Sequence, residues 1–255
     1  MLKPRDLAWP RASRLWVLGQ AGLVLLLICF YFGIRGLTVG STEDAVDHAH
    51  DIVALEERLH LDIEDALQTP ASDSETVVTI ANWVYIWGHW PIIIVTMIWL
   101  LRWHSDVFRR LRDAMMLSGG VGMVIYATYP VAPPRLAGLG LIDTVSEQSQ
   151  SYRVLQPPAF VNQYAAMPSL HAGWDLLVGI SIVTASSTFA LRVIGYAMPT
   201  LMAVAVVLTA NHYVLDVVAG VALVLLAHAG ALGLERRRHR LQSRQPEVAV
   251  SPGGG

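Results

Sequence analysis

The chain has 255 residues, of which 54% are hydrophobic and 15% charged, and its mean hydropathy is +0.46. So few charges cannot coat a soluble globule of this size, and apolar stretches of roughly 20 residues recur, each long enough to cross a bilayer core of about 30 Å. An ordinary soluble protein is therefore excluded, and the net charge of −2 gives no indication of nucleic-acid binding. Cys29 is the only cysteine, which excludes an intrachain disulfide and a cysteine-based zinc site.

Six apolar segments are predicted to cross the membrane as helices. The first follows several basic residues and is interpreted as an uncleaved anchor, because a signal peptide has an apolar region of about 7–15 residues and a small-residue cleavage site. The second is expected to bend near Pro91. The predicted spans are approximately residues 15–34, 76–101, 114–132, 168–187, 193–209 and 213–234. Together they predict one all-α transmembrane domain over residues 1–235, an integral membrane six-helix bundle.

The basic residues are sorted unequally between the two sides of this predicted bundle. With the N-terminus inside, fourteen Lys and Arg residues fall on the inner side, and four fall outside: Arg35, Arg58, Arg135 and Arg153. Cytoplasmic segments accumulate Lys and Arg. We therefore expect a multi-pass protein of the plasma membrane with both termini in the cytoplasm.

The outer segment 41–75 carries eleven acidic residues and one basic residue, Arg58. Its apolar residues recur at steps of three and four, as in an amphipathic helix: Ile52, Leu55, Leu59, Ile63 and Leu67. The acidic face argues against docking on anionic lipid. We expect a lid or collar helix, packed on the bundle between spans 1 and 2. The tail 236–255 is predicted to be basic and disordered.

Ionisable groups inside membrane spans are costly and are candidates for function. In NHYVLD, Asp216 follows His212 by four residues, so on a helix the two side chains share a face. The carboxylate can hold one imidazole nitrogen as N–H and leave the other as a lone pair, which makes an oriented nucleophile or base. The alternative is a pair that only neutralises itself within the bundle.

A second group of residues indicates a phosphate site. In MPSLHAGW, Pro168, Ser169 and His171 begin the fourth predicted span, where free backbone N–H groups favour an anion. Arg135, in YPVAPPR, offers a planar fork that matches phosphate oxygens. In the predicted topology the span ends that carry Arg135, His171 and His212 all lie on the outer face.

The motifs YPVAPPR, AAMPSLHAGW and NHYVLD resemble the three signature motifs of the type 2 phosphatidic acid phosphatase superfamily. They are more similar to its inositolphosphotransferase branch, which includes inositol phosphorylceramide synthases, and YFGIRGL and ANWVYIWGH resemble bacterial members. The resemblance implies that His212 attacks phosphorus and that Asp216 orients it. It also implies that His171 protonates the leaving alkoxide, and that Arg135 and Ser169 hold the phosphoryl oxygens.

The chain departs from the general superfamily pattern at four positions. Thr128, Leu136, Ala205 and Val206 stand where a Lys, a Pro, a Ser and an Arg are expected. Two phosphate-binding cations are therefore missing, which favours the transferase branch over a plain phosphatase. Arg35 or Arg153 is a candidate to supply the missing charge, and the alternative for each is an ordinary interfacial arginine.

Other polar residues near the motifs are candidates for substrate contact. Three of them share one face of the second span, for which the alternative is ordinary polar packing. Asp175 follows His171 by four residues and either tunes it or has a structural role. The candidates are Arg35, Asn82, Tyr85, His89, Asp175, Asn211 and Tyr213.

These observations predict a membrane lipid phosphatase or phosphotransferase that acts on a lipid phosphate or phospholipid at the extracytoplasmic face. Arginine, a helix N-terminus and protonated histidine can neutralise phosphoryl charge, so no metal or cofactor is expected. Water and an alcohol such as inositol both remain open as acceptors. The alternative is a small proton-coupled transporter that uses intramembrane His and Asp. A catalytically inactive lipid-binding relative is disfavoured because both histidines and the aspartate are present.

Overall fold

The computed structural model describes residues 41–145 and 162–243, together with seven positions between Leu15 and Leu26. Within these residues one isolated parallel bridge joins Val131 and Ala165, and the regular elements are helical. They are α2 (Thr42–Leu59), α3 (Glu64–Ser72), α4 (Glu75–Trp87), α5 (Trp90–Trp103), α6 (Ser105–Thr128), the 3-10 turn η1 (Pro134–Leu136), α9 (Leu170–Ala185), α10 (Phe189–Leu208) and α11 (Val214–Gln242).

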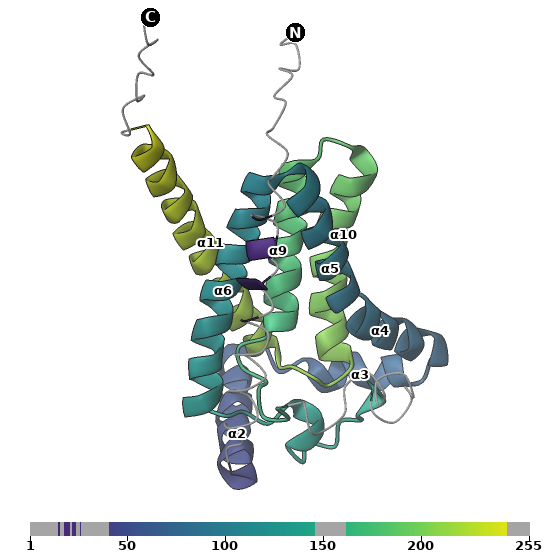
Figure 1. The fold of residues 1–255 in the computed structure, drawn as a ribbon. Coiled ribbons are helices and arrows are strands. Elements are labelled where there is room, and N and C mark those ends of the chain that lie inside the picture. The colour runs from purple at the N-terminus through teal and green to yellow at the C-terminus, as the bar shows by residue number, and fades with distance from the viewer. Residues whose placement is uncertain are drawn as a thin grey trace, which may run out of the picture.

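Helix α9 lies at the centre of the bundle and packs against α5, α6, α10 and α11 (Figure 1). Helices α2 and α3 gather at one end, near the point where α11 begins, and the far end of α11 extends away from the opposite end (Figure 1). The residues at the N-termini of α9 and α11 therefore meet the acidic helices at the same end of the molecule.

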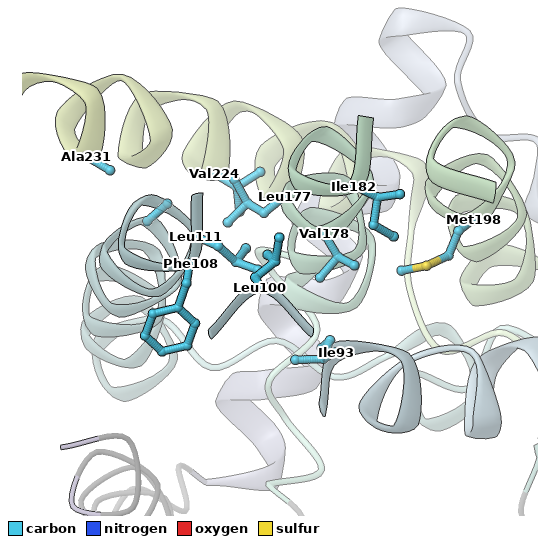
Figure 2. Packing of buried hydrophobic residues seen from close by; sticks show 11 residues of the cluster. Ile93, Leu100, Phe108, Leu111, Leu177, Val178, Ile182, Met198, Val224 and Ala231 are labelled. Carbon is cyan, nitrogen blue, oxygen red and sulfur yellow. The ribbon is translucent and has the colours of Figure 1, made fainter. Parts of the chain in front are cut away.

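The main core lies between α9 and its neighbours. Figure 2 shows Leu177 and Val178 of α9 among Leu100, Leu111 and Val224, all of which are buried. Glycines permit the close approach of these helices, because a Cβ on Gly179 would overlap the carbonyl oxygen of Gly195, and one on Gly220 would overlap that of Ser169. The second contact places α11 directly against the start of α9.

Among the described residues, two helices are long and apolar enough to cross a membrane, Phe189–Leu208 and Val214–Leu241. The pair Glu75–Trp87 and Trp90–Trp103 meets the same test as one span bent by 42°. Helix α9 is apolar but has 16 residues, or about 24 Å of helix, which is shorter than a typical bilayer core. A membrane protein is supported, whereas the count of six spans remains a prediction, and most of the first span lies outside the described residues.

The predicted bend of the second span is confirmed. The helix breaks at Gly88 and His89, and Pro91 stands in the first turn of α5. A proline costs little at that position because its missing N–H would have no partner within the helix.

Helices α6 and α11 extend beyond the third and sixth predicted spans, whose bounds remain predictions. Helix α6 begins at Ser105, nine residues before the predicted start of the third span, and its charged residues there are paired: Arg110 binds Glu235, and Arg112 binds Asp113. Residues 129–132 are not helical, since Val131 hydrogen-bonds with Tyr164 and Ala166. Helix α11 continues to Gln242, so the first residues of the tail that we expected to be disordered are helical.

The acidic outer segment forms two helices, and its buried face differs from the predicted one. In α2 the buried residues are Ala45, Ala49, Ile52 and Glu56. The rest of the predicted apolar stripe is 40–52% exposed: Leu55, Leu59, Ile63 and Leu67. The chain turns at His60, which has a φ of 58°, so α3 does not continue the helical register on which that stripe depended. Small residues and a glutamate face the bundle instead.

Candidate active site

His212 lies in the short loop between α10 and α11 and is buried. Its Nδ1 is 2.8 Å from the carbonyl oxygen of Ala166 and 3.4 Å from Oδ2 of Asp216. A carbonyl oxygen can only accept, so the neutral ring carries its proton on Nδ1 and a lone pair on Nε2. The ring is thus oriented as the sequence predicts, but its shorter contact is with the main chain.

Asp216 connects three parts of this site. Its Oδ2 accepts from the backbone N–H of Tyr213 at 2.9 Å as well as contacting His212. Its backbone carbonyl accepts from the N–H of Ser169 at 2.9 Å. Ser169 caps α9, and its hydroxyl accepts from the N–H of Ala172 at 3.4 Å. The second and third motifs are therefore joined directly through the main chain.

Arg135 lies in η1 and reaches the same loop. Its backbone N–H donates to the carbonyl of Ala210 at 3.1 Å, and Nη1 donates to Oδ1 of Asn211 at 2.5 Å. Its Nε lies 3.1 Å from Oδ2 of Asp143. Asn211 also donates to the hydroxyl of Thr209 at 2.8 Å, which fixes its amide. Asn211 and Asp143 thus hold the guanidinium of Arg135 next to the loop that carries His212.

His171 stands in the first turn of α9 between two groups of rings. Its ring centroid is 5.7 Å from that of His212 and 4.4 Å from that of His89. Tyr85 of α4 stacks on it at 4.8 Å. The residues expected on the second span therefore do reach the site through Tyr85 and His89, and they surround His171 rather than His212.

Asp175 does not form the pair with His171 that its spacing suggested. Its Oδ1 lies 2.9 Å from Nδ1 of His89, and both side chains are buried. His89 lies at the break between α4 and α5, which turns its ring toward α9. The described site therefore contains two His–Asp pairs, one at His212 and one at His89, with His171 between the two imidazoles.

The remaining predicted contacts have other surroundings. Asn82 is buried and donates to the carbonyl of Thr144 at 2.9 Å, so it fixes the loop after η1. Tyr213 is buried and donates to the carbonyl of Ala132 at 3.2 Å, so it belongs to the packing beneath the site. Arg35 and Arg153 lie outside the described residues.

Two participants were missed by the sequence reasoning. Ala166 contributes its backbone carbonyl. Because every residue has this group, the sequence gives no signal for the contact. Asp143 is one of twenty acidic residues, and nothing in its sequence neighbourhood indicates its pairing with Arg135. Thr128, at the place of the expected Lys, donates its hydroxyl to the carbonyl of Val124 within its own helix. Across the described residues, His, Cys, Asp and Glu form no group of three or more suited to a metal ion.

Comparison with protein families places this geometry in context. The family model described as the PAP2 superfamily matches residues 50–230, which is more than two thirds of the chain and includes Arg135, Ser169, His171, His212 and Asp216. Searches of curated proteins and of solved structures give no match. The family match and the membrane-compatible helices support an enzyme of phosphoester hydrolysis associated with a membrane. The chain belongs to the PAP2 superfamily.

Proposed function

We propose that the protein is a membrane lipid phosphatase or phosphotransferase that works through a phosphohistidine at His212. One observation carries the proposal: Nδ1 of His212 is held by Ala166 and Asp216, and this leaves the lone pair of Nε2 for attack. The substrate class is a lipid phosphate or phospholipid, because the site lies at the end of a bundle with membrane-compatible helices.

In the first step, Nε2 of His212 attacks phosphorus while the bond from phosphorus to the lipid oxygen breaks. His171, whose ring is 5.7 Å from that of His212, gives a proton to the departing alkoxide. Arg135 and the N-terminus of α9 at Ser169 balance the negative charge on the phosphoryl oxygens. The products are a neutral lipid alcohol and phosphohistidine.

In the second step, water or an alcohol such as inositol attacks the same phosphorus and the P–N bond breaks. The proton of the attacking hydroxyl passes to His171, which restores the acid for the next cycle. Nε2 of His212 regains its lone pair. The nature of the acceptor decides between hydrolysis and transfer, and the covalent intermediate serves both.

His89 and Asp175 are assigned to support His171 rather than to touch the phosphoryl group. The Asp175 carboxylate holds Nδ1 of His89 at 2.9 Å, and the His89 ring packs against His171 with a centroid distance of 4.4 Å. This contact fixes the position of the His171 ring between His89 and His212.

The intermediate provides the direct test. With substrate labelled at the transferred phosphorus, a rapid quench in base should trap label on the protein, and peptide mapping should place it at His212. His212→Ala should acquire no label, and chelator should leave the yield unchanged because the proposal uses no metal. Active enzyme that never acquires label would rule out the covalent mechanism.

The general acid can be tested separately. A nitrophenyl phosphate needs little protonation of its leaving group, so His171→Ala should lose less activity on it than on an alkyl lipid phosphate. His212→Ala should lose activity on both. Equal losses across the two substrates for both variants would contradict the assignment of roles.

We also propose that the active site faces the extracytoplasmic side and that both termini are cytoplasmic, on the basis of the unequal sorting of Lys and Arg. Single cysteines at Asp62 and at Ser187, both exposed and at opposite ends of the bundle, test this in a Cys29→Ser background. An impermeant thiol reagent should label position 62 in intact cells and position 187 only after lysis. The reverse pattern would overturn the orientation.

A further inference from the structure

Three carboxylates converge on the first turn of α11. Oδ2 of Asp216 accepts from the N–H of Tyr213 at 2.9 Å. Oε1 of Glu64 accepts from the N–H of Val214 at 2.9 Å, and Oε1 of Glu56 accepts from the N–H of Leu215 at 2.7 Å. Three successive N–H groups that have no partner within the helix are thus capped from three different helices, α11, α3 and α2.

Glu56 and Glu64 are buried, and each makes its contact across more than a hundred residues of sequence. A helix N-terminus carries a partial positive charge that favours carboxylates. Each contact also fixes the position of the first turn relative to α2 or α3. His212 lies only two residues before Val214, so the same contacts determine where its ring stands.

The three carboxylates also influence one another electrostatically. Burial and the neighbouring Glu64 and Asp216 raise the pKa of Glu56 to about 8, against its hydrogen bond from Leu215, which lowers it. The groups that face Glu56 are Glu64 from α3, and Asp216 and the phenol of Tyr213 from α11. A carboxyl whose folded pKa is raised stabilises the fold less as pH rises from its unfolded pKa of 4.5 toward 8. The docking of α2 on α11 should therefore weaken over that range.

We infer that Glu56 and Glu64 are positioning residues for His212, and that the acidic helices α2 and α3 are a working part of the active site. The inference rests on the proposed function, since it concerns the histidine that attacks phosphorus. Neither glutamate touches the phosphoryl group. They act by holding the turn from which His212 projects, and the sequence alone suggested only a cover over the bundle.

The test compares Glu56→Ala and Glu56→Gln with Glu57→Gln, a control at the next position of the same helix, where the side chain is exposed. The measured quantities are the single-turnover rate of phosphoenzyme formation, KM and the pH profile. Glu56→Ala should lower the rate about tenfold to a hundredfold, because small displacements of a reacting group have effects of this size. KM should stay near the wild-type value, since the phosphoryl-binding groups remain.

Glu56→Gln keeps an acceptor oxygen for Leu215 but cannot titrate. It should keep most of the rate and should lose the part of the pH dependence that falls between about pH 4.5 and 8. Glu64→Ala should behave like Glu56→Ala, and Glu57→Gln like wild type. Circular dichroism and gel filtration report whether each variant folds, and if Glu56→Ala does not fold, the pH profile of Glu56→Gln decides.

A wild-type rate in Glu56→Ala would overturn the inference, and so would an unchanged pH profile in Glu56→Gln. A rise in KM at unchanged rate would also contradict it, because that pattern belongs to a substrate-binding role. If instead wild-type protein forms no phosphoenzyme with any lipid phosphate, the proposed function fails first, and this outcome is visible before any variant is compared.

Discussion

Where α6 begins and α11 finishes, Arg110 donates two hydrogen bonds of 2.9 and 3.0 Å to Glu235, and Arg238 lies 2.8 Å from Asp113. At the other end of the bundle, Glu56 and Glu64 face backbone N–H groups of α11. The first end balances charge with charge between two helices. At the second end, main-chain groups hold Glu56, Glu64 and His212, and the charged groups surround a candidate phosphoryl site instead of joining two helices. The ion pairs at the first end stabilise the packing of α6 against α11, whereas the hydrogen bonds at the second end position the side chains of the candidate site.

Removal of His212, the proposed nucleophile, should show the largest difference in activity between the two ends of the bundle. His212→Ala should lower hydrolysis of a lipid phosphate roughly a thousandfold or more, as expected for loss of a group that acts covalently. Glu235→Gln, at the opposite end, should keep wild-type activity. Hydrolysis by the purified variants in detergent measures both, and comparable losses would remove the functional distinction between the ends.

Loss of the second His–Asp pair should have a smaller effect. His89→Ala and Asp175→Asn should each reduce activity on alkyl lipid phosphates about tenfold to a hundredfold, because they support the acid rather than replace it. Activity on a nitrophenyl phosphate should fall less. His104→Ala provides the control, since that ring packs on Trp99. Equal losses on both substrates would show that the pair supports only the fold.

Substitution of two glycines tests whether helix packing beside the candidate site affects activity as well as stability. Gly220→Ala and Gly179→Ala both force a Cβ against a backbone carbonyl, so each should cost about 1–3 kcal/mol of stability by overpacking. Gly220 presses on Ser169, and Gly179 presses on Gly195. Thermal unfolding should therefore shift in both variants, while activity corrected for folded protein should fall only in Gly220→Ala. Loss of activity in both would contradict a local effect.

The smallest effect is expected at the charge-paired end. Arg110 and Glu235 are each 20% exposed, so Arg110→Gln should cost about 1 kcal/mol or less after allowance for solvent screening. Activity should not change. Unfolding in detergent measures the difference, and a loss of activity without unfolding would show that the two ends are coupled through α11.

The motifs that meet in the candidate site could be recognised in the sequence because the residues of each motif are close together in the chain. PSLH and NHYVLD each contain a histidine, a helix start and a neighbouring polar group, and this local pattern indicates both the element and the chemistry. Their approach to one another followed from the order of apolar segments. The bend near Pro91 was predictable for the same reason, since proline acts on its own turn.

The residues that the sequence did not indicate have partners far along the chain. Glu56 contacts Leu215 and Asp143 contacts Arg135, and neither spacing is that of a helix or a strand. The apolar pattern of the acidic segment favoured the stripe from Leu55 to Leu67, which is exposed. Hydrophobic periodicity cannot predict that a carboxylate is buried because backbone N–H groups donate to it. Helix α6 begins nine residues before the predicted third span, in a charged segment whose partners on α11 the sequence does not indicate.

The carbonyl oxygen of Ala166 is closer to Nδ1 of His212 than Oδ2 of Asp216 is, and no amino-acid substitution can remove a backbone carbonyl. If a side chain alone fixed the imidazole, Asp216→Asn could reverse the sense of the hydrogen bond by presenting an NH2 group. Here the tautomer would survive that substitution. A lower turnover in Asp216→Asn would therefore reflect the lost negative charge and the weakened hydrogen bond at the start of α11, and not a change in the orientation of the His212 ring. Mutational scans that rank side chains would pass over position 166, although its carbonyl holds Nδ1 of His212 and so leaves Nε2 free of that contact.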